Sequence, residues 1–387
     1  MVEAFFAILV GNSPGLATIM ADVEFFDTPT VASVKKHHIV SKYVAGWANI
    51  VLPKAKAREG KIMYVDLFCG PGQYEDGTAS IPLLILEHTI NTPTLCENLQ
   101  TVFNDKNKDY ITALEARIAQ LPGIERLRHK PKFRNRTIGH DIIPSIKRIN
   151  VPTLFFADPF GYQGVSIDLI EAALSHWGSD FLFFFNYNRI NMNLGSDVMN
   201  EPINEFFSAE RAEQLRATIA RLGPAQREQA ILKAMMDAIK GLGARAEKFT
   251  YRSETGTRTT HHLVCVSKHQ QGIALFKEIS AKESPRFDDN VPSLDYNPGT
   301  DPAQGLLFSP LAQLEDELVT TFAGKILTTD EIYHEHHNGR PYVIKNYRQA
   351  LLHLEETGAV QIDPPRAIRR QPDTLPGTAR ITFRHAG

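Results

Sequence analysis

Residues 65–73 read VDLFCGPGQ, and this stretch decides the predicted fold. It ends the apolar run KIMYVDLF, residues 61–68, which a Gly/Pro cluster closes, as is typical of a buried strand. Gly70 and Gly72 lack a Cβ, so the backbone there can turn tightly and approach a ligand. The helix that follows offers free N–H groups and the positive end of its dipole. The stretch therefore predicts the strand–turn–helix corner at which an α/β domain binds a nucleoside or dinucleotide, with an ordinary corner as the alternative.

Strand and helix patterns alternate on both sides of this corner. Residues 34–52 form one apolar face at helical spacing, and Pro53 is expected to end that helix. FLFFF at residues 181–185 is apolar throughout and must be buried on both faces, as in a central parallel strand. The alternation predicts βαβ units and a doubly wound sheet, with a late strand pair as an antiparallel edge. The remaining expected strands are residues 99–104, 134–141, 153–157, 249–253 and 262–267, and the expected helices are residues 81–89, 108–121, 144–149, 168–175 and much of 205–242.

The last part of the chain carries a different pattern. Residues 284–305 are rich in Pro, Asp, Asn and Gly and are interpreted as a linker. Three helices and two short strands around a Pro/Arg loop are expected beyond it, which is a winged-helix pattern: residues 311–322, 329–335, 342–357, 359–363 and 380–383. The predicted domains are an N-terminal extension (1–34), an α/β domain (35–283), a linker (284–310) and a winged-helix-like domain (311–387).

Composition limits the class of protein. The chain has 387 residues, 43% of them apolar and 22% charged, which is ordinary for a soluble protein with a sizeable core. A net charge of −2 does not indicate a nucleic-acid protein as a whole, although it leaves room for a local basic patch. The 3 cysteines are scattered without a CxxC pair, which predicts neither disulfides nor a thiolate zinc site and suits the cytoplasm.

No membrane or targeting segment is predicted. No apolar run reaches the roughly 18 residues of a membrane span. Residues 1–10 are apolar but lack the basic start of a secretory signal. A more ordinary N-terminus begins at Met20, so the residues before it are interpreted either as an extension without a structural role or as part of the protein proper.

Asp66 ends the first predicted strand, and its charge discriminates between ligands. A pyrophosphate site would disfavour a carboxylate there, whereas an amine-bearing ligand favours one. Asp66 therefore favours the methionyl end of S-adenosylmethionine (AdoMet) over NAD as the predicted ligand.

Asp105 follows the second strand, where an acid accepts hydrogen bonds from ribose hydroxyls. It lies farther from the glycine turn than the usual distance of about 20 residues. Alternatively, Asp105 or Asn104 caps the next helix.

Further polar residues follow the later strands, whose carboxyl ends line one crevice in a parallel sheet. Asp141 could meet the adenine amino group, or be a cap or surface carboxylate. Asp158, Pro159 and Phe160 resemble the DPPY-type signature of amino-methylating enzymes, in which the acid binds the amine and an aromatic ring stacks on the base. The alternative is that Asp158 only holds the turn. Asn186 begins NYNR, a segment suited to a polar or anionic substrate or to a turn.

Basic residues gather in the winged-helix candidate. Arg340, Lys345 and Arg348 lie at or in its third helix, and Arg369 lies in the wing loop. This is the arrangement of a helix in a major groove with a wing on the backbone. Because acidic residues occupy the other helices, a protein-docking or solvated module is the alternative. The histidines lack a metal-binding spacing such as HExxH, so no metal site is predicted: His334, His336 and His337, and the adjacent pairs at 37–38 and 261–262.

Taken in order, these motifs resemble a known family, the three-Cys-motif partner proteins (TcmP). The resemblance covers nearly everything after about residue 35. The matching segments are Lys36, His37 and Ile39 with Tyr43 and Trp47, then VDLFCGPG, NDK at residues 104–106, DPFG, FNYNRINMNL at 185–194, SKHQQGIALFKEI from Ser267 and HNGRPYVIKNYRQALLHLEETGAV from His337. DPFG departs from DPPY in its second proline and final aromatic residue, which weakens the case for methylation of a base amine.

The resemblance implies a Rossmann-like AdoMet methyltransferase sheet, AdoMet as cofactor and a companion protein with a three-cysteine, radical-AdoMet-like motif. By the family pattern, Asp158 and Asn186 face the reacting group, and the cofactor contacts are Asp66, Gly70, Gly72 and Asp105. Phe68 and Asp141 complete the predicted cofactor set, and Pro159 and Phe160 the catalytic set. The predicted function is an AdoMet-dependent methyltransferase acting on DNA or RNA. The alternatives are a non-catalytic methyltransferase-like binding partner and a DNA-binding regulator.

Overall fold

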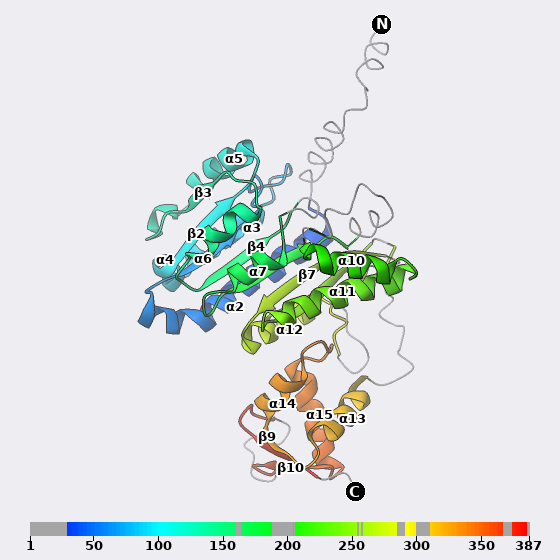
Figure 1. Cartoon of the computed structure of the whole chain (residues 1–387). Helices are drawn as coiled ribbons and strands as arrows, with labels where there is room; N and C mark the ends of the chain where they lie inside the picture. The colour runs from blue at the N-terminus through cyan, green and yellow to red at the C-terminus, as the bar shows by residue number, and fades with distance from the viewer. Residues whose placement is uncertain are drawn as a thin grey trace.

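The computed structural model describes residues 29–159, 164–187, 204, 206–253, 255–256, 258–284, 291–298, 310–366 and 374–384. A large sheet dominates the first part of the chain (Figure 1). Its strands are β1 Ile62–Asp66, β2 Leu99–Asn104, β3 Lys132–Arg134, β4 Thr153–Ala157, β5 Asp180–Phe185, β6 Arg245–Arg252, β7 Thr259–Ser267 and β8 Asp295–Tyr296. They lie in the order β3-β2-β1-β4-β5-β7-β6-β8.

The sheet is mostly parallel, and the predicted fold class is confirmed. β1 pairs in parallel with β2 and β4, and β4 with β5. β7 runs antiparallel to both of its neighbours, β5 and β6. The chain therefore forms the expected α/β sheet with an antiparallel strand pair near one edge. Because β1, β2 and β4 are adjacent and parallel, their carboxyl ends meet at one edge of the sheet.

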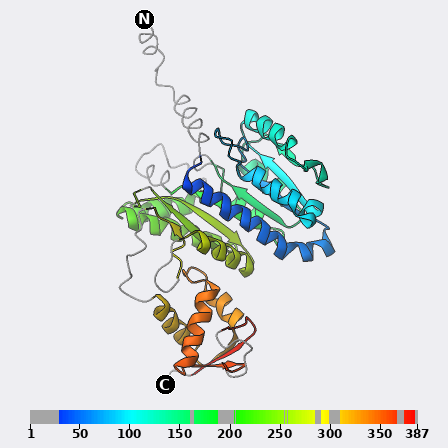
Figure 2. The same ribbon diagram turned by 180° about the vertical axis from the view of Figure 1, so that it is seen from behind.

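Helices cover both faces of this sheet (Figures 1 and 2). On the face seen in Figure 2, α2 and α12 lie side by side, and their side chains join one core with those of α3 and α5. On the opposite face α6, α7, α10 and α11 enclose a second core. The helices are α2 Val31–Arg58, α3 Ile81–Asn91, α4 Pro93–Asn98, α5 Lys108–Ala119, α6 Ile143–Lys147, α7 Ile167–Ala173, α10 Ala209–Ile219, α11 Pro224–Gly241 and α12 Gln270–Glu283, with 3₁₀ turns η1 Ile124–Arg126 and η2 His140–Ile142.

The prediction that Pro53 ends the first helix is wrong, because α2 continues to Arg58. Pro53 lacks the N–H that would bond to the carbonyl of Asn49. Both residues are exposed, so water can satisfy that carbonyl. The buried Leu52 and Ala55 on the other side keep the helix packed on the sheet. Burial of the apolar face therefore outweighs the single lost hydrogen bond.

The third strand differs most from its prediction. Residues 134–141 were expected to form it, but β3 ends at Arg134 and Asp141 lies in the 3₁₀ turn η2. Pairing explains the shift, because the β3 backbone follows β2 from Val102 to Asn104 and has no partner beyond. Asn104 instead closes the following segment, since its side chain donates to the carbonyl of Arg136 and accepts from the Arg136 amide.

The C-terminal part forms a winged helix with a core of its own. Its helices are α13 Pro310–Phe322, α14 Thr329–His336 and α15 Ile344–Glu356. A small sheet in the order β10-β11-β9 completes it, with β9 Ile326–Thr328, β10 Val360–Asp363 and β11 Arg380–Phe383. β9 was not predicted, because three residues show no periodicity. Buried apolar residues of all three helices and of β10 and β11 pack together, and the partly buried Leu327 of β9 packs against them.

Candidate functional site

Three predicted acidic residues gather where β1, β2 and β4 end. Asp66 is the last residue of β1, Asp105 follows β2 and Asp158 follows β4. A crevice of about 40 Å³ lies at this edge, and its walls include Asp66, Phe68, Gly70 and Asp158. Four predicted residues, from the ends of the two strands β1 and β4, therefore share one crevice.

Asp66 is almost fully enclosed, with 1% of its surface exposed. Its carboxyl accepts hydrogen bonds from the hydroxyl of Tyr64 and the backbone amide of Phe68, each at 3.2 Å. Burial penalises the charged form more than these two bonds stabilise it, so the pKa of Asp66 is raised to about 8. A carboxyl with a raised pKa in a crevice at the carboxyl ends of parallel strands makes Asp66 a candidate functional group.

Asp105 lies behind the glycine turn. Its carboxylate accepts the amide of Gly70 at 3.1 Å and the amide of Asn107 at 2.8 Å. Asn107, and not Asp105 or Asn104, accepts the hydrogen bond that caps α5. The helix is therefore capped as predicted, but by a different residue. The carboxylate of Asp105 instead fixes the glycine turn that faces the crevice.

Gly72 occupies a backbone conformation that glycine alone adopts readily, with φ +88°, and a Cβ there would lie 2.5 Å from Cδ1 of Leu114. We expect Gly72→Ala to lower the free energy of unfolding by about 1–3 kcal/mol, through strain and overpacking. Gly243→Ala is the matched control, because Gly243 also has positive φ but faces open space. Urea denaturation of both variants measures the difference. An equal loss at both positions would contradict a role for the Leu114 contact.

Lys36 was not predicted from spacing to reach the site, yet it enters the crevice from α2. Its Nζ lies 2.6 Å from Oδ2 of Asp158 and 4.9 Å from the centre of the Phe184 ring. Burial alone would lower the pKa of Lys36, but the attraction of Asp158 and other neighbours raises it above its usual value. Lys36 precedes Val40 by one helical turn, so the periodicity that predicted the helix also placed this cation on its buried face.

A neutral pair lies beside Lys36. The Nε2 atom of His37 is 3.3 Å from the hydroxyl of Tyr74, and both side chains line the crevice. Burial, together with the neighbouring Lys36 charge, lowers the pKa of His37 to about 4. His37 therefore stays uncharged near neutral pH and acts as a hydrogen-bonding group only.

The other predicted catalytic and cofactor residues that the structure describes do not line the crevice. Asp141 is exposed, and Pro159 and Asn186 are partly buried at the ends of their strands. The phenol of Tyr187, next to Asn186, donates to the carbonyl of Pro224 at 3.2 Å. Phe160 and Gly161, the last two residues of DPFG, lie outside the described residues.

The predicted nucleic-acid residues have different environments. The guanidinium of Arg340 pairs with Glu317 at 2.7 Å and donates to the carbonyl of His336 at 2.8 Å. Lys345 is exposed on the first turn of α15, Arg348 is partly buried, and Arg369 lies outside the described residues. Lys345 is therefore the member of this set that the structure presents to solvent.

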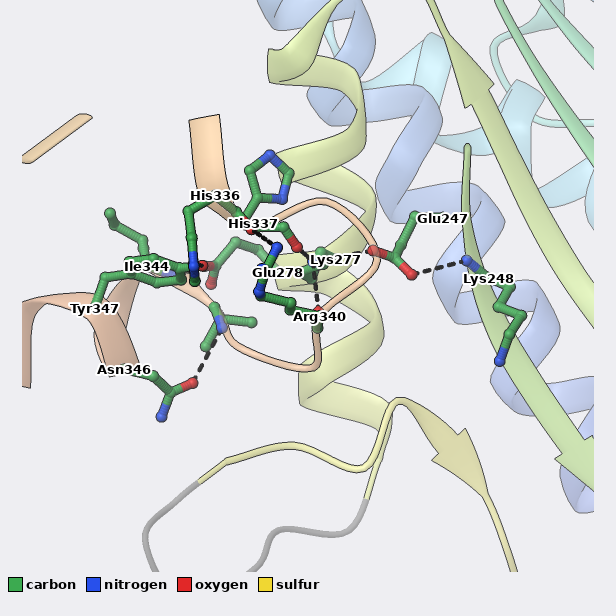
Figure 3. A network of polar contacts seen from close by, with 11 residues as sticks. Glu247, Lys248, Lys277, Glu278, His336, His337, Arg340, Ile344, Asn346 and Tyr347 are labelled. Atoms are coloured by element: carbon green, nitrogen blue, oxygen red, sulfur yellow. Dashed lines mark hydrogen bonds and ion pairs between the residues drawn. The ribbon is translucent and has the colours of Figure 1, made fainter. Parts of the chain in front are cut away.

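The start of α15 is attached to the α/β part of the chain (Figure 3). The Nζ of Lys277, on α12, is fully buried, lies 2.9 Å from Glu247 and donates to the carbonyls of His337 and Arg340. The next residue, Glu278, accepts the amide of Ile344 at 3.0 Å. Two consecutive residues of α12 thus hold the turn between α14 and α15.

The histidines near this turn have structural partners. His336 Nδ1 lies 2.8 Å from the hydroxyl of Tyr347, and the ring of His337 stacks on Tyr333 at 4.4 Å. Among the described residues, no group of three or more His, Cys, Asp or Glu side chains is placed to hold a metal ion. Nor does that part of the chain contain a helix with the length and apolar character that crossing a membrane requires.

Comparison with known proteins gives one family match and several distant structural likenesses. Residues 295–367 match the model of the GMT-like wHTH domain. None of the curated proteins matches the chain. The chain is similar to an rRNA methylase from Streptococcus thermophilus at 9% identity and a TM-score of 0.29, over 58% of this chain and 92% of that one. The chain is also similar to magnesium protoporphyrin IX methyltransferase from Synechocystis PCC 6803, at 11% identity and a TM-score of 0.30, over 66% of this chain and 95% of that one. A third similar structure is the bifunctional kinase-methyltransferase WbdD, at 11% identity and a TM-score of 0.32. The match covers 60% of this chain but only 39% of WbdD.

Proposed function

We propose that the chain is an AdoMet-dependent methyltransferase that acts on nucleic acid. The observation that carries the proposal is the buried carboxyl of Asp66 at the end of β1, facing the same crevice as Gly70. An acid at this place suits the ammonium group of a methionyl ligand. Lys36 offers the opposite charge, which suits the carboxylate of the same ligand. The crevice therefore offers an acid for the ammonium group and a cation for the carboxylate of an amino-acid end, and Asp66, whose pKa is about 8, loses its proton when the ammonium group binds.

The size of the crevice limits what it holds with its side chains in these positions. About 40 Å³ is far below the roughly 300 Å³ at the lower end of ligand pockets. The amino-acid end of AdoMet fits the charged groups that line the crevice. Entry of the nucleoside requires side chains such as Phe68 to move. When bound, AdoMet supplies an activated methyl group. The chain's own contribution is to hold the cofactor and to orient the acceptor in line with that group.

We assign roles to the acids on this basis. Asp66 binds the ligand ammonium, and Asp105 positions the Gly70 turn through its amide. Asp158 holds the acceptor after releasing Lys36. The GMT-like wHTH match at residues 295–367 and the exposed Lys345 support nucleic acid as the acceptor. The resemblance to the three-Cys-motif partner proteins supports a companion protein, which co-purification from the native host would test.

A second function, a non-catalytic binding partner with a methyltransferase-like fold, is favoured by one contact. The carboxylate of Asp158 is already paired with Lys36 at 2.6 Å, so the acid expected to bind the acceptor is engaged within the chain. Transfer of labelled methyl groups to DNA or RNA, measured with and without the companion, separates the two functions. AdoMet binding without transfer to either nucleic acid would favour the binding partner.

Isothermal titration with AdoMet tests the cofactor assignment. We expect the unaltered chain to bind and Asp66→Ala to weaken binding by about 30-fold or more, because a buried charge-assisted hydrogen bond contributes about 2 kcal/mol. Asp316→Ala, which removes an exposed carboxylate on α13, should bind as the unaltered chain does. If the unaltered chain fails to bind, or Asp66→Ala binds equally well, the proposal is wrong.

A further inference from the structure

A second and much larger cavity lies where the winged helix meets the sheet. It has a volume of about 750 Å³, and its walls come from α11, from β6 and β8, and from residues 338–341, the turn before α15. Figures 1 and 2 both show the winged helix next to this end of the sheet. We call this cavity the junction groove. It shares no lining residue with the crevice at Asp66.

The junction groove has a surplus of positive charge. Lys240 on α11 and Arg245 and Lys248 on β6 line it, and none of the three has a carboxylate within ion-pair distance among the described residues. The contact made by Lys248 Nζ is to a neutral hydroxyl, that of Thr250, at 3.4 Å. Lys240 is exposed and the other two are partly exposed. The groove therefore presents three cations that no carboxylate of the described residues neutralises.

The acids that line the groove are already neutralised. Glu247 pairs with Lys277, Asp295 with Arg252 at 3.2 Å, and Asp237 with Lys233. The remaining cation, Arg340, pairs with Glu317 outside the groove. The lining therefore has three uncompensated cations and no uncompensated acid.

The groove has fixed walls. Lys277 joins Glu247 of β6 to the carbonyls of His337 and Arg340, so the strand wall and the turn wall are held by one buried ammonium group (Figure 3). Glu278 fixes the amide of Ile344 just beyond. Fixed walls reduce the ordering cost of binding a ligand.

The arrangement of the cations indicates the chemistry of the ligand. A site for a single phosphate needs donors that converge on one point, whereas these cations are distributed over a helix and a strand along an open groove. Spaced cations in a groove fit the repeating charges of a phosphodiester chain. We propose that the junction groove binds the backbone of a nucleic acid, so that the strand contacts the sheet domain and the winged helix together. This inference deepens the proposed function and rests on it for the choice of nucleic acid.

Fluorescence anisotropy with a labelled DNA duplex and a labelled single-stranded RNA tests the groove in the full chain. The test variant is Lys240→Gln with Lys248→Gln. The control is Lys56→Gln with Lys130→Gln, which removes the same charge from exposed lysines elsewhere. For at least one probe, we expect the test variant to bind about 10-fold or more weakly at ~0.1 M salt, with the slope of log K against log salt reduced by roughly 1 to 2. The control should match the unaltered chain, and Arg245→Gln should show a smaller loss of the same kind.

Three outcomes would contradict the proposal that the groove binds nucleic acid. The first is unchanged affinity of the test variant for both probes, and the second is an equal loss of affinity in the control. The third is displacement of the probe by free inorganic triphosphate at matched phosphate concentration. The last outcome would identify a small anion instead of a strand. Titration of the same variants with AdoMet separates this proposal from the proposed function. Loss of nucleic-acid binding without any AdoMet binding supports the groove and rejects the cofactor. If AdoMet binds and the groove variants bind nucleic acid as the unaltered chain does, the cofactor assignment is supported and the groove proposal is rejected.

Discussion

Lys277→Met is expected to destabilise the attachment of the winged helix by roughly 3–5 kcal/mol, as is typical when one partner of a buried ion pair is removed. Methionine nearly matches lysine in length but offers no charge and no donor. Glu247, which is 6% exposed, would lose its buried partner. The carbonyls of His337 and Arg340 would lose the hydrogen bonds that Lys277 donates. Burial lowers the pKa of Lys277, so the ammonium group depends on these contacts.

The measurement for Lys277→Met is the free energy of unfolding, together with amide hydrogen exchange at Ile344, whose protection should fall as the turn separates from α12. Lys282→Met is the control, because Lys282 is exposed on the same helix and should change stability by less than about 0.5 kcal/mol. Adding Glu247→Gln to Lys277→Met should restore part of the loss, since it removes the isolated charge. If Lys277→Met behaves like the control, the ammonium group does not hold the two parts together.

Asp66 should make the stability of the chain fall as pH rises. Its pKa is about 8 in the folded chain and 3.8 in its ordinary state, so between these values the folded chain binds more protons than the unfolded chain. The free energy of unfolding therefore decreases from about pH 4 to about pH 8. Asp66→Asn should remove this slope and be more stable than the unaltered chain above about pH 8, by roughly 6 kcal/mol.

The pH test uses urea denaturation between about pH 5 and about pH 9. Lys36 and Asp158 stay in place in Asp66→Asn, so the difference between the two proteins isolates the Asp66 carboxyl. Asp316→Asn, at an exposed position, should leave the pH profile unchanged. A parallel profile for Asp66→Asn and the unaltered chain would show that Asp66 ionises normally. Under the proposed function, binding of an ammonium ligand also tightens as pH rises toward about 8, with release of a proton from Asp66.

The sequence predicted the central strands well because their burial on both faces leaves a clear apolar signal. β2 and β4 have the predicted bounds, and β5 differs by one residue. β11, in the small sheet of the winged helix, also has its predicted bounds. Short elements failed for the opposite reason. β3, β8 and β9 have only two or three residues, and pairing with a neighbour alone defines them. β8 lies inside the segment interpreted as a linker, where it pairs with Thr250 and Tyr251 of β6.

Some residues of the candidate site could likewise be predicted from the sequence, and others could not. Asp66, Gly70 and Asp158 could be predicted because Asp66 ends a recognisable strand and the other two follow one, and parallel strands bring their ends together. Lys36 reaches Asp158 only through the packing of α2 on the sheet. The junction groove was beyond prediction, since its cations come from α11 and β6 while its far wall belongs to another domain.

The position of β7 has a consequence for the growing chain. β5, with the sequence DFLFFF, pairs on one side with β4 and on the other with β7, and α10, α11 and β6 all precede β7 in the sequence. Until β7 has been synthesised, β5 presents an apolar strand with one unpaired edge. Open edges of this kind invite pairing between chains and aggregation. A fragment that ends before Thr259 is therefore a poor choice for producing the sheet domain, however complete its proposed cofactor crevice.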